Sequence, residues 1–486
     1  MNLMHRRLVR FLIVFAMLAA APAQASAGES YAAWSGYSQV TLRGAHELSP
    51  CQECGGYAAD LDGDGAVDRV EISIQTPSNV LRKFTFASTR TGRPLEPGIY
   101  RGATPDDVSG RPQMLLGPVD ICYSSSGAGS FEILYAEFDT TGAVPRVVSF
   151  WARFELRCNG EIYPFKGEVA LNVPDLPRVA HVRPSANAKS LNIYGERIES
   201  ATSLVVDGLP ATFKLDAAGG IKARVSRLST GRHDVRVGGA NGYLSPPFSF
   251  TVGDDPPFAK GSFQLDSDPG DLIGNGGTYR FRNKPMALNT MLDIDGYPNE
   301  ISIGVITAEK SFDVTVTSEK MHAPLAVGEY RDAARHPFEA EGKPGIGISA
   351  SDRPGCNEIL GNFTITSYGL DDRLLARIRW VSLDFDLHCD GNPAGLRGST
   401  RMVGPEPVVI LATSYSAASR TLRVRATGLT RDVELWVDGQ RLGPTTIEGD
   451  VVVLSNVTLG AGQHLIGIYR PDVLRYDFSQ PWLVTL

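Results

Sequence analysis

The sequence lacks long apolar runs beyond its first residues, and it holds few stretches with helical periodicity. A helix that spans a membrane needs roughly 20 consecutive apolar residues, and no stretch after residue 27 supplies them. We therefore expect no transmembrane segment. The chain instead holds 51 Gly and 31 Pro among 486 residues, a composition that favours strands and turns over helices.

The sequence also has no excess of basic charge. The formal net charge is −7, from 47 Lys and Arg against 54 Asp and Glu. Residues 1–27 contain three Arg and no acid, so their removal would change the net charge from −7 to −10. Nucleic acids and anionic membrane surfaces both attract basic proteins. The charge therefore predicts no nucleic-acid partner.

Recognisable catalytic motifs are also absent. The sequence has no His-Glu-x-x-His, no Gly-x-Ser-x-Gly and no phosphate-binding glycine loop. A search of this kind cannot find residues that come together only in the folded chain. The sequence favours a non-enzymatic role without deciding the question.

The first 27 residues have the parts of a secretory signal peptide. Arg6, Arg7 and Arg10 form a basic start, residues 8–21 are apolar, and residues 25–27 (Ala-Ser-Ala) offer a small-residue cleavage site. We interpret residues 1–27 as a signal peptide. The mature protein is then expected to be exported, either periplasmic, extracellular or associated with the cell surface.

One pattern occurs twice in the chain. Residues 154–160 read Phe-Glu-Leu-Arg-Cys-Asn-Gly, and residues 385–391 read Phe-Asp-Leu-His-Cys-Asp-Gly, at an offset of 231. Both alternate apolar and polar residues, as strands with one buried face do. Other short segments recur at offsets of 230 to 232, such as Val-Asp-Gly at 206–208 and 437–439. An offset this constant indicates an internal duplication.

The duplication and the linker-like stretches divide the chain after the signal peptide into four units, in the order A–B–A′–B′. Unit A covers residues 28–175, unit B 176–254, unit A′ 255–405 and unit B′ 406–486. Short alternating segments separated by turn residues predict strands. We predict an all-β, multi-domain fold of tandem β-sandwiches.

Unit B resembles immunoglobulin-like domains of the IPT/TIG type, known from plexins, some transcription factors and many bacterial surface proteins. The resemblance rests on residues 191–195, 204–208 and 231–237, and it implies an immunoglobulin fold for B and B′. Unit A′, with Asp-Pro-Gly-Asp at 268–271 and the segment 385–391, is similar to a module of exported bacterial proteins. That module has no assigned activity, so it implies no mechanism.

Six cysteines in an exported chain are expected to form disulfides. Cys122 and Cys158 lie equidistant from a turn near residue 140, and Cys356 and Cys389 flank a turn near residue 372. Residues equidistant from the turn of an antiparallel hairpin lie opposite each other. We predict the pairs Cys122–Cys158 and Cys356–Cys389, each worth about 4 kcal/mol in the chain-entropy model.

Cys51 and Cys54 have no counterpart in unit A′. A Cys-x-x-Cys pair can serve redox chemistry or bind a metal. No second such pair and no histidine cluster completes a zinc site, and no βαβ pattern supports thioredoxin-like chemistry. We favour a local disulfide, Cys51–Cys54, that closes the loop.

The motif with the most specific chemistry is Asp-Leu-Asp-Gly-Asp-Gly-Ala-Val-Asp at residues 60–68. Calcium prefers six to eight oxygen ligands, which alternate aspartates around a glycine turn can supply. The spacing satisfies the EF-hand pattern with Glu71 at the twelfth position, but the flanking residues indicate strands. The loop is therefore similar to the sites of integrin-type FG-GAP repeats. That resemblance implies a calcium ion held by Asp60, Asp62, Asp64, the Ala66 carbonyl and Asp68.

The alternative is an Asp/Gly turn without a metal, because these residues are common in turns. The corresponding segment of unit A′, residues 293–299, lacks the third aspartate and the second glycine, so the fold does not require the ion there. Four carboxylates within nine residues would repel one another without a cation. We therefore predict a calcium ion in unit A that stabilises the loop and takes no part in catalysis.

Two tryptophans are candidate ligand-binding residues. Trp151 and Trp380 lie among charged residues on the strand face that we expect to point away from the core. Aromatic rings in such places often contact sugars or protein partners. The alternative is that another strand or the neighbouring B unit covers each ring.

These features predict an exported binding, adhesion or envelope-structural protein whose partner is a glycan or a surface protein. The alternative is an extracellular glycan-active enzyme or its carbohydrate-binding accessory protein. A folded cleft lined by converging carboxylates and aromatic rings would favour the enzyme.

Overall fold

The computed structural model shows an all-β chain. It describes residues 29–486 except those at 39–42, 51–52, 76–80, 89–90, 92, 105–109, 118–127, 143, 158–164, 175, 217–218, 241, 254–260, 283–285, 293–297, 307–309, 354, 372–376, 405, 432, 444, 473–474 and 480–481. Within these described ranges, two short 3₁₀ helices, η1 (Ile198–Ser200) and η2 (Glu319–Met321), lie between the strands. The predicted all-β, multi-sheet architecture is confirmed.

The first ten strands form one sheet, in which β2, β1, β10, β9, β3, β4, β5 and β7 follow one another and β8 joins β9 to β6. A parallel bridge between Thr104 and Gln113 connects the ends of β6 and β7, so the strands from β9 round to β8 close on themselves. The strands are β1 (Glu29–Ser38), β2 (Arg43–Pro50), β3 (Glu53–Ala59), β4 (Arg69–Gln75), β5 (Leu81–Ala87), β6 (Gly98–Ala103), β7 (Gln113–Gly117), β8 (Ala128–Asp139), β9 (Arg146–Arg157) and β10 (Phe165–Val173).

A second ten-stranded sheet has the order β20-β19-β28-β27-β26-β24-β25-β23-β22-β21. Its strands are β19 (Ser262–Ser267), β20 (Thr278–Arg282), β21 (Met286–Leu292), β22 (Pro298–Ile306), β23 (Ser311–Thr317), β24 (Gly328–Arg335), β25 (Gly345–Ala350), β26 (Ile359–Asp371), β27 (Arg377–Cys389) and β28 (Gly395–Val403). We match β19 to β1 and each later strand to the next one in turn. The two sheets then pair their strands in the same order, except that β3 also pairs with β9 in the first sheet, whereas β21 and β27 are not paired among the described residues.

The cores of these two sheets repeat the same contacts. In each, a tyrosine ring stacks on a phenylalanine, Tyr100 on Phe131 and Tyr330 on Phe363, with centroids 4.7 and 4.5 Å apart. In each, a second phenylalanine lies across the strand pair from a glycine, and a Cβ there would overlap the ring; these pairs are Phe154 with Gly167 and Phe385 with Gly398.

The remaining strands form two pairs of smaller sheets, each pair enclosing one core. Residues 178–252 fold as β11-β12-β16-β15 and β14-β13-β17-β18, with bounds β11 (Arg178–Pro184), β12 (Ser190–Glu196), β13 (Ser203–Val206), β14 (Leu209–Pro210), β15 (Thr212–Leu215), β16 (Ile221–Arg224), β17 (Gly231–Gly238) and β18 (Phe248–Val252).

Residues 410–485 fold as β29-β30-β34-β33 and β32-β31-β35-β36, with β37 also paired to β35. The bounds are β29 (Ile410–Ser416), β30 (Thr421–Ala426), β31 (Glu434–Val437), β32 (Gln440–Leu442), β33 (Thr446–Glu448), β34 (Val451–Ser455), β35 (Gln463–Asp472), β36 (Arg475–Phe478) and β37 (Trp482–Thr485).

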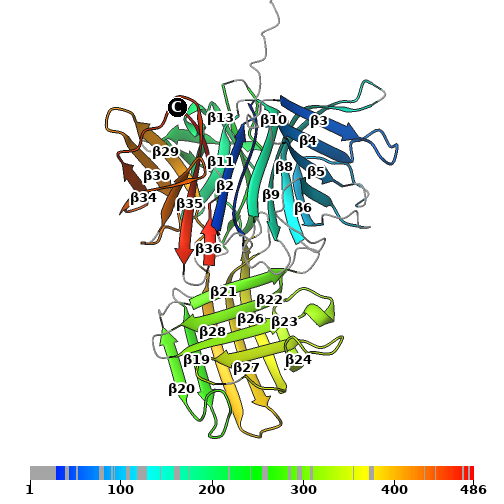
Figure 1. Cartoon of the computed structure of the whole chain (residues 1–486), viewed down its shortest axis with the longest axis vertical. Helices are drawn as coiled ribbons and strands as arrows, with labels where there is room; N and C mark the ends of the chain where they lie inside the picture. The colour runs from blue at the N-terminus through cyan, green and yellow to red at the C-terminus, as the bar shows by residue number, and fades with distance from the viewer. Residues whose placement is uncertain are drawn as a thin grey trace, which may run out of the picture.

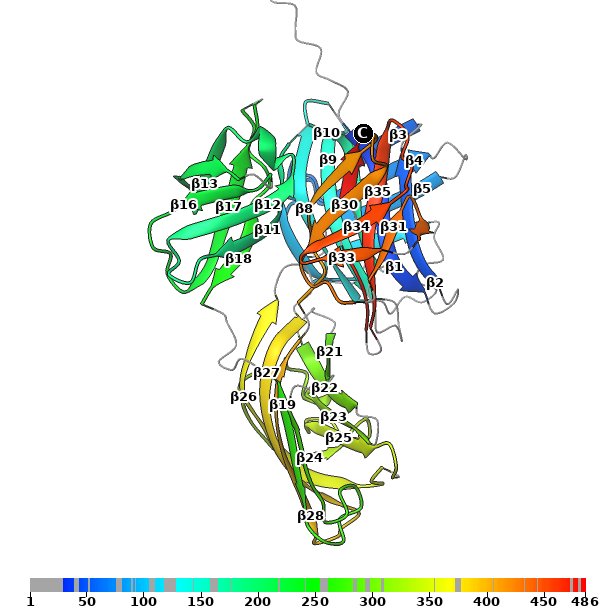
Figure 2. The same cartoon turned by 90° about the vertical axis from the view of Figure 1, so that its left-hand side faces the viewer.

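The four units are not arranged in a row in the order of the sequence. Units A, B and B′ lie together at one end of the molecule, and unit A′ projects from them at the other end (Figure 1). A view at right angles shows the same arrangement (Figure 2). Strands β1 and β2 contact β36 and β35, while β11 and β12 contact β29. Unit A therefore packs against B′, and B packs against B′.

Candidate functional site

The aspartate-rich segment is the loop between two antiparallel strands. β3 and β4 pair so that Ala59 lies opposite Arg69, which makes residues 60–68 the connection. As expected from its alternation, the segment that follows the loop is a strand, β4, in which Val70, Ile72 and Ile74 are buried. The flanks are strands, so the loop is not an EF-hand.

Backbone hydrogen bonds fix the first aspartate and the last. The two carboxylate oxygens of Asp60 accept from the amides of Gly63 and Gly65 at 2.7 and 2.8 Å, and both glycines have positive φ, 81° and 91°. The Asp68 carboxylate accepts from the Leu61 amide at 2.9 Å and is only 3% exposed. Glycine adopts the positive φ values of residues 63 and 65 without strain. Gly63 and Gly65 therefore allow the loop to turn so that their amides reach the Asp60 carboxylate.

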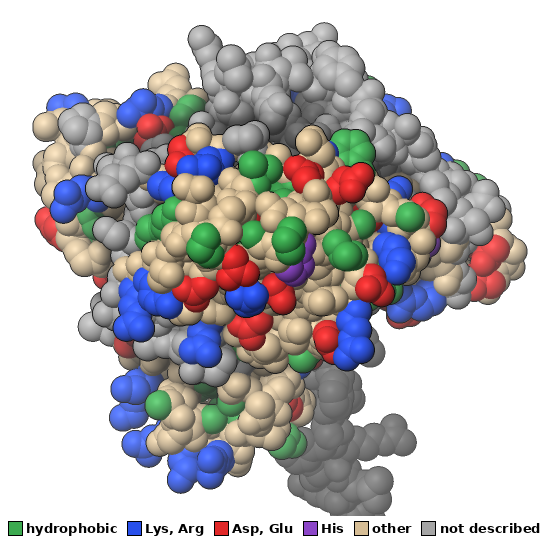
Figure 3. Space-filling model, turned by 90° about the horizontal axis from the view of Figure 1, so that it is seen from below, with side chains coloured by type: hydrophobic (Ala, Val, Ile, Leu, Met, Phe, Trp, Pro, Cys, Tyr) green, Lys and Arg blue, Asp and Glu red, His purple; other side chains and the backbone are tan. Residues whose placement is uncertain are grey.

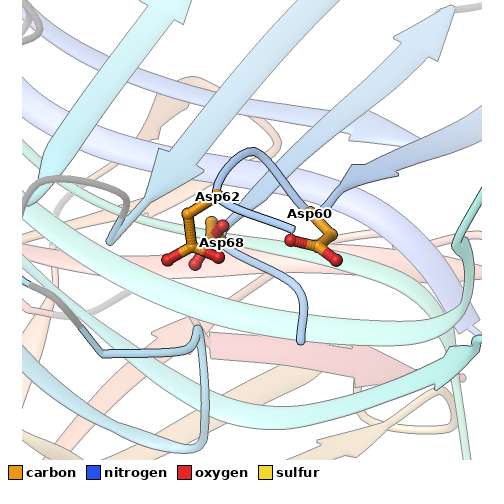
Figure 4. A group of neighbouring side chains, drawn as sticks. All are labelled: Asp60, Asp62 and Asp68. Carbon is orange, nitrogen blue, oxygen red and sulfur yellow. The ribbon is translucent and has the colours of Figure 1, made fainter. Parts of the chain in front are cut away.

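Three carboxylates converge in this loop. One oxygen each from Asp60, Asp62 and Asp68 lies within 4.8 Å of the others, and Figure 4 shows the three side chains around one centre. Asp64 does not join this group; its carboxylate accepts from the Ala66 amide at 2.8 Å. The geometry brings together three of the four predicted aspartates.

Glu71 belongs to the strand and not to the loop. Its carboxylate pairs with Lys83 on the neighbouring strand at 3.1 Å and with Arg69 at 3.9 Å. These cations satisfy it away from the three aspartates. Among the described residues, the group of converging carboxylates includes Asp68 and does not include Glu71.

The neighbouring carboxylates disfavour the ionised form of Asp62. The hydrogen bond from the Asp64 amide lowers the pKa of Asp62, but partial desolvation and the charges of Asp68, Asp64 and Asp60 outweigh it, so the pKa is raised. A divalent cation at the centre would reverse this effect by attracting all three charges. The site has the chemistry of a hard, oxygen-liganded cation.

The predicted disulfide Cys356–Cys389 is confirmed, with the two Cα atoms 5.3 Å apart. It ties the residue at the end of β27 to the segment before β26. Cys54 is also in a disulfide, but its predicted partner, Cys51, lies outside the described residues, as does the pair Cys122–Cys158.

The prediction of two exposed tryptophan platforms is wrong, because Trp151 and Trp380 are only 2% and 7% exposed. Trp151 packs with Leu465 of unit B′, and the guanidinium of Arg178, from unit B, lies 4.2 Å from its ring centroid. Trp380 lies over Gly369, where a Cβ would overlap the indole. Coverage by a neighbouring unit, the alternative considered above, holds for Trp151; the Trp380 ring lies over its partner strand β26 in the same sheet.

A partly buried charged group in unit A′ was not found from the sequence. His336 lies between two carboxylates, with Nε2 3.3 Å from Glu300 and Nδ1 3.1 Å from Glu339. The hydrogen bond to Glu300, helped by Glu339 and opposed by burial, raises the pKa of His336 to about 9. The three residues come from β22 and from the loop between β24 and β25, so no spacing in the sequence indicated them.

Both B units carry a histidine with acceptors at each ring nitrogen. His233 contacts Asp207 at 2.7 Å and the Ser229 carbonyl at 2.9 Å; His464 contacts Asp438 at 2.7 Å and the Gly460 carbonyl at 3.0 Å. Two acceptors require both nitrogens to donate, which only the imidazolium can do. Burial alone lowers each pKa, but the hydrogen bonds raise it overall.

No family model matches the chain, and no curated protein matches its sequence. Among solved structures, SGBP-B of the Bacteroides ovatus mixed-linkage glucan utilization locus, in complex with a mixed-linkage heptasaccharide, matches over 80% of this chain and 85% of that one. The sequence identity is 11% and the TM-score 0.17. A TM-score this low supports no inference about fold or function.

Within the described residues, no helix has the length and apolarity to cross a membrane. Seen from below, acidic and basic side chains are interspersed, and hydrophobic side chains lie scattered among them (Figure 3).

Proposed function

We propose that this chain is an exported binding or adhesion protein in which a calcium ion stabilises unit A. The observation that carries the calcium assignment is the convergence of Asp60, Asp62 and Asp68 within 4.8 Å. The ion would be held by these carboxylates, with Asp64 and the Ala66 carbonyl, both in the same loop, as the further candidate ligands.

Export is supported by the signal-peptide pattern at residues 1–27 and by a disulfide, which persists in oxidising compartments. The partner we propose is a glycan or a surface protein. A glycan array probed with the purified mature chain tests the first class. Its failure would leave the calcium assignment standing, because that assignment rests on the loop alone.

Calorimetric titration with calcium tests the ion directly. We expect saturable binding of one ion. At a calcium concentration 100 times the dissociation constant, the bound ion adds about 2.7 kcal/mol to the stability of unit A, or a rise of roughly 5–10 °C in its unfolding temperature.

Two variants test whether calcium binds at the aspartate loop and not elsewhere in unit A. The double variant D60N/D68N removes two of the three converging carboxylates and is expected to abolish both binding and the thermal shift. Glu71→Gln is the matched control, because Glu71 pairs with Lys83 outside the group, and it should bind calcium normally. An unfolding temperature that calcium leaves unchanged in the unaltered chain would overturn the proposal.

A further inference from the structure

A polar cavity of about 290 Å³ lies between units B and B′. Its walls come from β11 and β12 on one side and from β29, β30 and the turn before β34 on the other. Figure 2 shows β11 and β12 at the side of unit B that faces the rest of the upper group. The volume is close to the lower end of the range for small-molecule sites, about 300 Å³.

The cavity is part of a built interface between the two units. Ala180, on β11, packs against the hydrophobic core of unit B′. The Arg425 guanidinium, on β30, lies 5.3 Å from the ring centroid of Tyr194, on β12. The units therefore meet through an apolar contact and a cation–π contact beside the cavity.

Several hydrogen-bond donors that line the cavity have no acceptor among the described residues. Arg425 donates from Nε to Asp450 at 2.6 Å, and within the described part of the chain its two Nη groups donate to nothing. Arg183 is exposed. Neither the Arg183 guanidinium nor the Asn192 amide has a hydrogen-bond partner among the described residues.

Among the described residues, the acceptors of the cavity are also only partly paired. Asp450 is exposed, and one of its carboxylate oxygens accepts the hydrogen bond from Arg425. Glu406 is also exposed. The two arginines and the two acids of the lining cancel in formal charge. A neutral, strongly polar lining of this kind suits a ligand that carries both an anionic group and several hydroxyl groups.

We propose that the cavity between B and B′ binds an acidic sugar residue, with its carboxylate on Arg183 and its hydroxyl groups on Asn192 and Asp450. A planar guanidinium pairs with a carboxylate through two parallel hydrogen bonds, and sugar hydroxyls donate to carboxylate oxygens. Arg425, held by Asp450 and Tyr194, positions the opposite wall. This inference rests on the proposed glycan-binding function and names its site and ligand class.

Isothermal titration of the full mature chain tests the proposal with matched ligands. The methyl glycosides of glucuronic and galacturonic acid carry the carboxylate, and methyl glucoside lacks it. Succinate carries carboxylates without the sugar. We expect at least one uronide to bind at least tenfold more tightly than methyl glucoside and than succinate.

Variants locate the site. Arg183→Gln is expected to weaken uronide binding at least tenfold, and Arg425→Gln to weaken it as well. Arg423→Gln is the control, because Arg423 is exposed on the same strand and pairs with Glu448 outside the cavity; it should bind as the unaltered chain does. Thermal unfolding of each variant confirms that it is folded.

The possible outcomes distinguish this proposal from the glycan-binding function proposed above. Uronide binding that Arg183→Gln leaves unchanged would overturn the site and keep a glycan-binding function. Equal binding of uronide and glucoside, or of uronide and succinate, would overturn the ligand class. No binding of any sugar here or on a glycan array would overturn the proposed glycan partner together with this inference. Each titration is repeated with a chelator, because the cavity holds no part of the aspartate loop and its affinity should not change.

Discussion

Units A and A′ share the order of their strands but differ in what covers the same face of the sheet. In unit A, Ala33, Trp151 and Ala170 form an apolar patch with Leu465 of unit B′. The residues at the same register positions of unit A′ are polar: Gln264, Ser382 and Arg401. The apolar face is buried between units, and Arg401 is exposed.

The comparison shows how a duplicated unit takes on two roles. Burial of apolar side chains stabilises the contact of A with its neighbours, and a charged residue at the corresponding position disfavours such a contact for A′. Trp380 is not the counterpart of Trp151; it occupies the position of Ser149. The sequences of the corresponding loops differ as well, because residues 293–299 of A′ lack the third aspartate and the second glycine of the loop in A.

The largest expected effect comes from giving unit A the residue of unit A′. Ala170→Arg places a charge where the side chain is fully buried, and an uncompensated buried charge costs about 3–5 kcal/mol. We expect unit A to separate from B′, with a larger radius of gyration in X-ray scattering. Arg401→Ala, the reverse change in A′, should leave the scattering unchanged. An equal response to the two changes would show that the register comparison does not explain the packing.

The next largest effect concerns the disulfide of unit A′. C356A/C389A removes a bridge with a sequence separation of 33, which contributes about 3–4 kcal/mol in the chain-entropy model. Substitution is preferable to a reductant, because a reductant would also reach the disulfide of Cys54. Calorimetry should show a lower unfolding temperature for unit A′ and an unchanged unfolding temperature for unit A. A decrease in both unfolding temperatures would mean that the two units unfold together.

Raising the pH should weaken unit A′ more than unit A. The folded pKa of His336 is about 9, above the unfolded value of about 6.5. Its contribution is therefore complete below pH 6.5 and is lost as the pH rises through about 9, amounting to up to about 3 kcal/mol. Urea unfolding at pH 6 and pH 9.5 measures the loss. His336→Asn should remove the pH dependence, whereas His322→Asn, at an exposed pair, should retain it.

A smaller effect is expected in the two B units. The raised pKa values of His233 and His464 mean that each pair with its aspartate stabilises below the unfolded pKa and is lost as pH rises through the folded one. The ring of His233 packs by Phe250. NMR titration of the two imidazoles gives both values. A titration at or below pH 6.5 for either ring would contradict the imidazolium assignment.

Part of this account could be predicted from the sequence, because it depends on local pattern. The flanking residues predicted strands on both sides of the aspartate loop, as β3 and β4 are, and hairpin symmetry around residue 372 paired Cys356 with Cys389. The aspartate loop was found because its candidate ligands lie within nine residues of one another.

The rest depends on packing between distant segments. The tryptophan on the outer face of β9 was expected to be exposed, because alternation identifies the face of a sheet but not what covers it. The cavity between B and B′ joins β12 and β30, which are separated by more than 200 residues. His336 meets Glu300 only through the pairing of the strands. No spacing in the sequence carries these relations.

Hydrogen exchange with and without calcium tests the difference between A and A′ most directly. Calcium is expected to slow exchange in residues 60–68 and in the flanking strands β3 and β4 at least tenfold, which a bound ion produces by suppressing local opening. Strands β21 and β22, at the corresponding place in A′, should exchange at the same rate in both conditions. Equal exchange in β3 and β4 with and without calcium would contradict the account, and so would equal protection of β21 and β22.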